Sequence, residues 1–183
     1  MTEPDASEPL VGREDDLDDE SYQIREVYAQ YGLTNYASQV MEKGVVNTLV
    51  LKANAASSTP TAQNFDVLFE QHARLPLGQL LRAFQKALPS ESAVHDALST
   101  ALPLRNFIAH TFFWDRSVDF MSFSGRESML AELIEARLLF EATDALVGEL
   151  TRRVAADVGI DAETFERNLA ETQAELRAEI PDS

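Results

Sequence analysis

Three polar residues lie close together in an apolar segment, and their types suit acid–base chemistry beside an anion. Residues 104–113 read LRNFIAHTFF and hold Arg105, Asn106 and His110. On a helix, Asn106 and His110 are four positions apart and share a face, and Arg105 lies about 100° round from Asn106. Histidine titrates near neutral pH, arginine offers paired N–H donors to an anion, and asparagine can orient an imidazole ring. This segment is the candidate functional site of the chain.

Arg105 also interrupts the apolar pattern of its own helix. The positions with core spacing are Val94, Leu98, Ala101, Arg105, Ile108 and Phe112. An arginine that points toward a core or an interface needs an anionic partner or a buried hydrogen-bond network. One interpretation is therefore that Arg105 belongs to a functional site. The other is structural: Arg105 reaches the edge of the bundle and pairs with an acid such as Asp115 or Glu141, while His110 bonds a nearby carbonyl.

An Arg-Asn-x-x-x-His sequence on the third long helix of a helical bundle resembles the HEPN superfamily (higher eukaryotes and prokaryotes nucleotide-binding). The mark of that family is R-x4–6-H, with Asn, Asp or His usually following the arginine. Here the spacing is four, and Arg105, Asn106 and His110 fill the three marked positions. In a chain of this composition such a match is expected roughly 0.02 times by chance. The likeness covers residues 21–153.

Many HEPN proteins are metal-independent endoribonucleases, often toxins or defence proteins, whose site forms where two motif helices meet in a dimer. The resemblance implies a homodimer that cleaves RNA and not DNA, without a cofactor or a metal, and an antitoxin or a nucleotidyltransferase as a further partner. It implies that His110 is the acid/base residue, that Arg105 holds the scissile phosphate and that Asn106 orients them. The superfamily also contains noncatalytic members, so a dimerisation or regulatory module with a structural motif is the alternative.

The elements that would position these residues are all predicted to be helices, because no segment shows sustained two-residue alternation. We expect an all-α, antiparallel, HEPN-like bundle of four to five helices. The expected helices cover residues 21–54, a short segment around 65–72, 76–88, 90 to about 113 with a kink at Pro103, and 124–158, followed by a last helix from 161. The expected domains are an acidic tail at 1–20, the bundle at 21–158 and an acidic C-terminal helix at 159–183.

The helix over 124–158 has the clearest signals. Ser124-Gly-Arg-Glu127 matches a capping box, and Gly159 is placed to end the helix in the left-handed conformation. Between them runs an apolar series with alternating steps of four and three: Met129, Leu133, Ala136, Phe140, Thr143, Val147, Leu150 and Val154. Such a series predicts a long helix that faces the core along its whole length. In the last helix, Phe165, Leu169, Leu176 and Ile180 form a narrow apolar stripe.

Charge and composition limit the classes of function. The formal net charge is −16, of which −8 lies in residues 1–20 and −6 in 154–183, so the middle of the chain is almost neutral. This charge argues against nonspecific nucleic-acid binding but leaves room for a local basic site. The chain has no cysteine, which excludes disulfides and thiolate metal sites. Residues 1–10 lack the features of a signal peptide, and no apolar run is long enough to span a membrane, so we expect a cytoplasmic location.

Other aromatic and histidine residues have structural and functional interpretations. Tyr28, Tyr31 and Tyr36 have helical spacing that favours packing, although aromatic rings can also stack on bases. The sequence Phe-Phe-Trp at 112–114, directly after the motif, is interpreted as a packing plug or a dimer contact. His72 and His95 stand alone in the sequence and are expected to be surface or structural residues.

Overall fold

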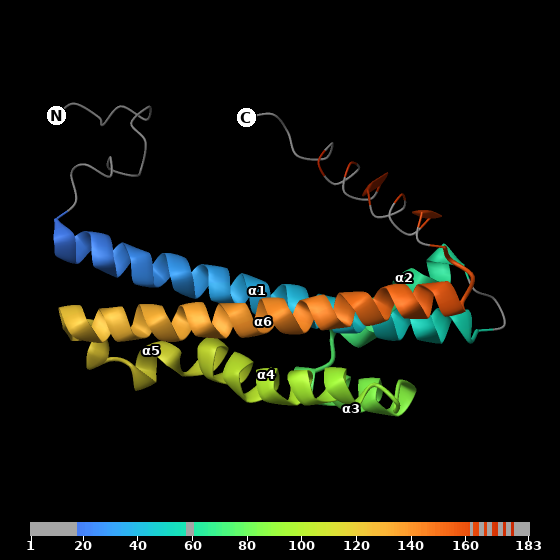
Figure 1. Ribbon diagram of the computed structural model, residues 1–183, viewed down its shortest axis with the longest axis horizontal. Coiled ribbons are helices and arrows are strands. Elements are labelled where there is room, and N and C mark those ends of the chain that lie inside the picture. Colours follow the sequence, from blue (N-terminus) through green and yellow to red (C-terminus); the bar gives the residue numbers. More distant parts are fainter. Residues whose placement is uncertain are drawn as a thin grey trace, which may run out of the picture.

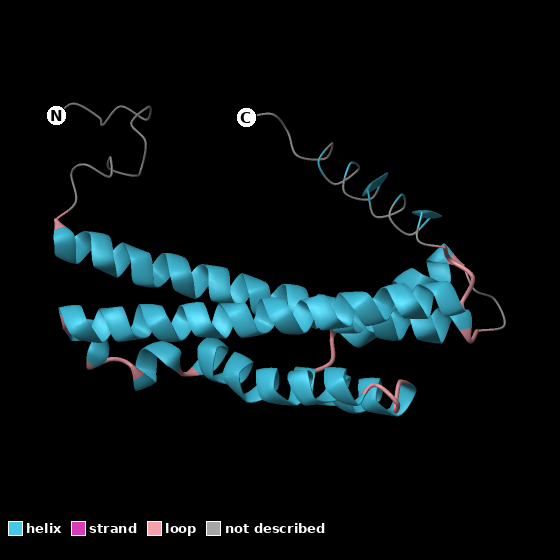
Figure 2. Cartoon of the chain, in the orientation of Figure 1, coloured by secondary structure: helices cyan, strands magenta, loops and turns pink. Residues whose placement is uncertain are grey.

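All regular structure is helical in the residues that the computed structural model describes, namely 18–57, 61–161 and a few positions between 163 and 177. The helices are α1 (Asp19–Ala55), α2 (Ala62–Ala73), α3 (Leu77–Ala87), α4 (Ser92–His110), α5 (Phe112–Asp115), the 3-10 helix η2 (Asp119–Met121) and α6 (Phe123–Asp157). Figures 1 and 2 show these helices joined by short connections. The predicted all-α bundle is confirmed. The predicted tail at residues 1–17 and the stripe from Phe165 to Ile180 lie outside the described residues.

The two longest helices, α1 and α6, lie side by side and run in the same direction (Figure 1). Thr34 Oγ1 of α1 donates a hydrogen bond to the carbonyl of Leu133 at 3.0 Å, and the hydroxyls of Thr48 and Thr151 are 2.7 Å apart. Residue numbers therefore rise together along both helices. Threonine suits these buried positions because its hydroxyl also bonds a carbonyl one turn earlier in its own helix. Its burial therefore leaves no polar group unpaired.

Helix α4 runs antiparallel to α6. Glu91, just before α4, pairs with Arg153 near the end of α6 at 2.7 Å, whereas Arg116, after α4, pairs with Glu132 near the start of α6 at 2.7 Å. The predicted antiparallel packing thus holds for α4 against the long pair, and the pair itself is parallel. This arrangement brings the C-terminal end of α4 to the middle of α1, and α5 and η2 continue toward the end of the bundle where α1 and α6 begin (Figure 1).

The core consists mostly of the positions that periodicity selected. Every member of the α6 series from Met129 to Val154 is buried, as are all the apolar members of the α4 series. On α1 the packing expected of Tyr36 is wrong, because this residue is exposed, whereas Tyr28 is partly exposed and its ring contacts Phe113 and Phe120. Polar residues are buried on α1 instead: Gln23, Thr34, Ser38 and Thr48. The reason is that α6 packs on the face that carries these threonines, which leaves part of the more apolar face open.

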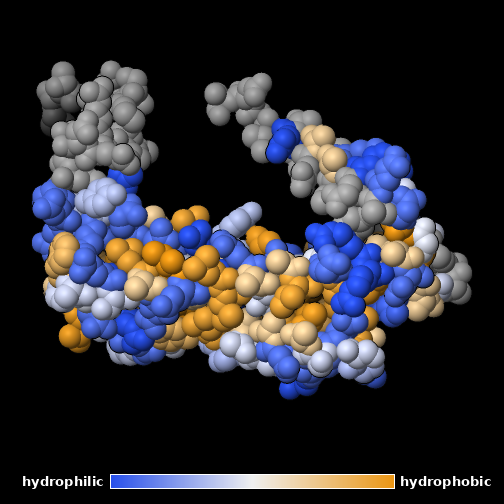
Figure 3. All heavy atoms as spheres, viewed as in Figure 1, coloured by the Kyte–Doolittle hydropathy of each residue, from blue (hydrophilic) through white to orange (hydrophobic). Residues whose placement is uncertain are grey.

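Apolar side chains also remain exposed on the outside of the long pair. Figure 3 shows a band of apolar residues over this part of the molecule. The large apolar residues of α1 and α6 with more than a third of their surface exposed are Tyr22, Tyr28, Leu33, Tyr36, Val40, Phe123, Ile134, Leu138 and Leu146.

The C-terminal end of α6 lies where the sequence predicted it, and the N-terminal end does not. Gly159 has a φ of +84°, and Ile160 N donates to the carbonyl of Ala155 at 2.9 Å, which confirms the left-handed C-terminal cap. At the start, the predicted capping box at Ser124 is wrong by two residues. Ser122 is the N-cap, and its Oγ accepts a hydrogen bond from Gly125 N at 3.1 Å. Ser122 fits because its backbone is extended, as an N-cap requires.

Two other helix boundaries differ from their predicted positions. Helix α1 begins at Asp19, and its N-cap Asp18 accepts a hydrogen bond from Ser21 N at 2.7 Å, which also lowers the pKa of the Asp18 carboxyl. The last three residues of the predicted tail are therefore part of α1 and its cap. Helix α4 does not start at Ser90, which lies in a turn, and it ends at His110 because Thr111 leaves the helical conformation before α5. Pro103 lies inside α4 without ending it.

The contact between η2 and the first turn of α6 requires a glycine. A Cβ added at Gly125 would collide with the backbone carbonyl of Asp119 and lie 2.6 Å from its Cα, whereas a Cβ at Gly148, also in α6, would meet nothing within 4 Å. We predict that Gly125→Ala lowers the free energy of unfolding by about 1–3 kcal/mol. The control Gly148→Ala should leave it unchanged or raise it by up to about 1 kcal/mol. Urea unfolding measures both, and equal stability of the two variants would contradict this packing.

Candidate functional site

The three residues predicted from the sequence come together at the end of α4, and a fourth residue joins them from α1. Arg105 donates hydrogen bonds from Nε and Nη2 to the two carboxylate oxygens of Glu42, the second at 3.4 Å. Its Nη1 donates to Asn106 Oδ1 at 3.3 Å and lies 3.5 Å from His110 Nε2. One guanidinium group therefore contacts all the other members of the site. We call these four residues the Arg105 cluster.

The exposure of the cluster changes from one side to the other. The side chains of Arg105 and Glu42 are 24% and 22% exposed, whereas Asn106 and His110 are exposed residues. The ion pair lies partly between α4 and α1, and the amide and the imidazole lie at the surface. A ligand from solvent can therefore reach Asn106, His110 and the neighbouring edge of the guanidinium without opening the bundle.

Glu42 is the member of the cluster that sequence reasoning missed. The acids named as structural partners of Arg105 were Asp115 and Glu141, and the observed partner is neither of them. Glu141 lies 3.4 Å from Arg137 on its own helix. Periodicity places Arg105 on one face of its helix but does not show which helix lies opposite that face. The sequence carried no separate signal for Glu42, because its place at the margin of the core face of α1 follows from the burial of Met41 in the structure.

An aromatic cluster supports the chain where α4 ends. Phe112 is buried, and the ring of Phe113 lies 5.2 Å from that of Tyr28, 4.8 Å from that of Tyr31 and 5.9 Å from that of Phe120. Such ring pairs favour tilted and edge-on contacts, as seen here. Packing is therefore the observed role of Tyr28, Tyr31, Phe112 and Phe113. These contacts fix the helix break directly after His110.

The Arg105 cluster does not include the other aromatic and histidine residues that were considered from the sequence. Trp114 is 84% exposed and Tyr36 is 68% exposed. The His72 ring bonds the carbonyl of Leu68 through Nδ1 at 2.8 Å, and the His95 ring packs edge-on against Phe84. Both histidines have the structural surroundings expected from the sequence.

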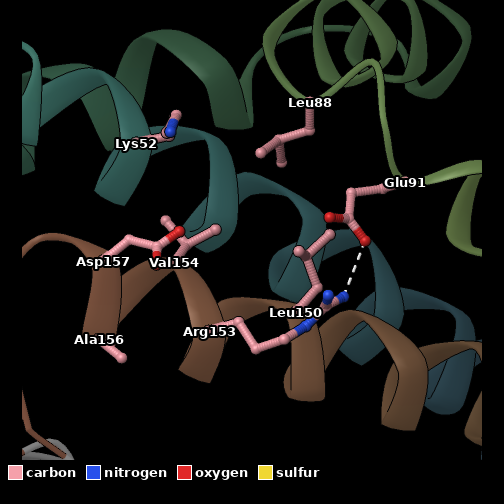
Figure 4. A pocket seen from close by; sticks show the side chains of 8 residues that line it. All are labelled: Lys52, Leu88, Glu91, Leu150, Arg153, Val154, Ala156 and Asp157. Atoms are coloured by element: carbon pink, nitrogen blue, oxygen red, sulfur yellow. Dashed lines mark hydrogen bonds and ion pairs between the residues drawn. The ribbon is translucent and has the colours of Figure 1, made fainter.

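A pocket of about 310 Å³ lies at the opposite end of α4. Figure 4 shows its lining, in which Glu91 faces Arg153 across a 2.7 Å ion pair, with Lys52 and Asp157 nearby. Glu91 precedes α4 and His110 ends it, and a helix of this length spans about 28 Å. The pocket is therefore separate from the Arg105 cluster. Its two acids and two bases balance, so it offers no net charge to an ionic ligand.

Neither a cluster of metal ligands nor a helix fit to span a membrane is found among the described residues. Within residues 18–57, 61–161 and the few described beyond them, no group of three or more His, Asp or Glu residues is placed to hold a metal ion. None of the helices in that same part of the chain combines the length and the apolar character needed to cross a membrane.

Comparison with known proteins adds no family assignment. No family model matches the chain, and neither a curated protein nor a solved structure matches it significantly. The Arg105 cluster, with the motif that its residues form, is therefore the feature of the chain that bears on its function.

Proposed function

We propose that this chain is a HEPN-type, metal-independent endoribonuclease that acts as a homodimer, with Arg105, Asn106 and His110 as its catalytic residues. The observation that carries the proposal is the guanidinium of Arg105, whose Nη1 lies within 3.5 Å of both Asn106 Oδ1 and His110 Nε2 at the exposed end of α4. An anion-binding group and an acid/base group are thus adjacent and open to solvent. RNA cleavage without a metal can use this combination.

The chemistry proceeds by attack of the ribose 2′-hydroxyl on the adjacent phosphorus. A base removes the 2′-hydroxyl proton, the new P–O bond forms, and the bond to the 5′-oxygen breaks as an acid protonates that oxygen. The products are a 2′,3′-cyclic phosphate and a free 5′-hydroxyl. Arg105 donates to the nonbridging oxygens and offsets the charge that develops on them, so that no metal is needed.

A dimer supplies the second histidine that this scheme requires. Each chain has a single His110, whereas the reaction uses an acid and a base at the same time. The segment after the motif exposes apolar side chains suited to an interface: Trp114 at 84%, Val118 at 83% and Met121 at 79%. Large exposed apolar groups of this kind commonly mark interaction sites. In a toxin or defence setting, an antitoxin or a nucleotidyltransferase would be the partner that neutralises the dimer.

A second candidate is a noncatalytic dimerisation or regulatory module, and the Arg105–Glu42 ion pair favours it. A half-buried arginine that pairs with an acid on the neighbouring helix also serves to join α4 to α1. In that case removal of the guanidinium would change stability and no nuclease activity would exist. The two candidates therefore differ in what the same substitutions affect.

The catalytic proposal predicts EDTA-resistant cleavage of single-stranded RNA and no cleavage of DNA. His110→Ala should lower the rate at least about a hundredfold because it removes the acid/base group. Arg105→Lys should be similarly inactive because lysine keeps the charge but lacks the planar pair of donors. A gel assay of labelled RNA measures the rates, and thermal unfolding shows whether each variant is folded.

His72→Ala is the matched control for these variants, because His72 bonds a carbonyl in α2 and lies outside the Arg105 cluster. It should cleave at the wild-type rate. If His110→Ala were as active as the wild type, the catalytic assignment would be wrong. If wild-type protein cleaved no RNA while Arg105→Ala lost stability, the noncatalytic candidate would be supported.

The dimer proposal predicts that Trp114→Ser lowers the apparent mass toward that of a monomer at micromolar concentration. Burial of an exposed tryptophan in an interface contributes strongly to association, so its loss shifts the equilibrium. Multi-angle light scattering measures the mass. Tyr36→Ser, at another exposed aromatic residue on α1, is the control and should remain dimeric. A wild-type protein that is monomeric and active would contradict the two-histidine mechanism.

A further inference from the structure

The guanidinium of Arg105 has two edges that can each bind an oxyanion, and the structure uses only one of them for the ion pair. Glu42 occupies the side-on edge, which consists of Nε and Nη2. The end-on edge consists of Nη1 and the second hydrogen of Nη2. Nη1 lies on the side of Asn106 and His110. The carboxylate therefore leaves the edge next to the imidazole without an anionic partner, since Asn106 Oδ1, which accepts from Nη1 there, is a neutral amide oxygen.

We propose that Glu42 is the positioning residue of this site, and that it aims the end-on edge of Arg105 at an oxyanion bound beside His110. The oxyanion class is phosphate or a phosphodiester, because the end-on pair of donors matches two oxygens on one phosphorus. The identification of that phosphodiester as RNA rests on the proposed function. The role of Glu42 toward an oxyanion does not depend on cleavage.

A fixed arginine is needed because its side chain has four rotatable bonds. At an exposed site, an unheld guanidinium samples many positions and must be immobilised each time an anion binds. Asn106 alone contributes one hydrogen bond at 3.3 Å, whereas Glu42 contributes two that together define the plane of the guanidinium. Glu42 is also on α1, so that the position of Arg105 is set by the packing of two helices.

Glu42 has a second, opposing effect that the test must separate. Its negative charge lies next to the site and reduces the attraction of Arg105 for an anion. Glu42→Gln and Glu42→Ala both remove this charge, but only glutamine keeps a side-chain oxygen that can accept from Nε. A difference between these two variants therefore reports positioning alone.

The experiment is a titration with inorganic phosphate, followed by NMR through the resonances of the His110 ring and the Asn106 side-chain amide. We expect Glu42→Gln to bind phosphate at least about fivefold more tightly than Glu42→Ala, since an alanine leaves Arg105 unheld. Glu42→Asp keeps the charge but has a shorter reach, and it should bind more weakly than the wild type. This variant keeps the test decisive if Glu42→Ala does not fold.

Arg116 and Glu132 provide a matched control, because they form a similar two-bond pair at 2.8 and 2.7 Å with similar exposure. Arg116 lies over the Phe107 ring rather than beside His110. Glu132→Gln and Glu132→Ala should therefore bind phosphate equally well at the Arg105 cluster. In RNA cleavage, Glu42→Ala should lower kcat and Glu42→Gln should restore most of it.

Equal phosphate affinity of Glu42→Gln and Glu42→Ala would overturn the proposal, because the carboxylate would then act through its charge alone. Wild-type protein that shows no phosphate-dependent shift at His110 or Asn106 would overturn it as well. A wild-type protein that binds phosphate but cleaves no RNA would refute the proposed ribonuclease and leave the comparison of the Glu42 variants intact.

Discussion

The ion pair between Arg105 and Glu42 is the interaction on which the candidate site depends. Arg105 occupies a position where the α4 pattern expects an apolar residue, and a lone charge there would be costly to bury. Glu42 balances that charge from α1, and the remaining donors of the guanidinium lie toward Asn106 and His110. With side chains only 24% and 22% exposed, the pair resembles a buried one, for which replacement of both partners by apolar residues often costs little stability, whereas removal of one partner leaves an unpaired charge and destabilises. We infer that its main contribution is to the geometry of the site.

The parallel arrangement of α1 and α6 explains why this pair forms where it does. Two parallel helices require the chain to return along the bundle between them, and α4 makes much of that return as an antiparallel helix. The direction of α4 sets which of its ends meets the middle of α1, where Glu42 lies. The aromatic packing of Phe113 on Tyr28 and Tyr31 then holds the break that follows His110. The local geometry of the motif is thus a consequence of the order and direction of the helices.

Periodicity in the sequence was sufficient to predict the longer helices and the residues of α6 that face the core, but not α5 or η2. The sequence also predicted that Arg105, Asn106 and His110 lie near one another on one helix, because all three belong to a single local segment. It did not identify Glu42, since a helical pattern gives the face of a side chain but not the helix opposite. The cap of α6 was misplaced because Ser122 and Ser124 are both suitable N-cap residues, and the backbone conformation decides between them. The exposure of Tyr36 and Val40 likewise depends on which face of α1 receives α6.

We propose that Arg105, Asn106 and His110 direct attack by a ribose 2′-hydroxyl. A DNA oligonucleotide that contains one ribonucleotide tests this most directly, with EDTA present and the products identified by mass spectrometry. We expect a single cut on the 3′ side of the ribose, a 2′,3′-cyclic phosphate on the upstream product, and no cut with His110→Ala. Cleavage at deoxyribose positions, or a product with a 5′-phosphate, would show that the 2′-hydroxyl is not the nucleophile.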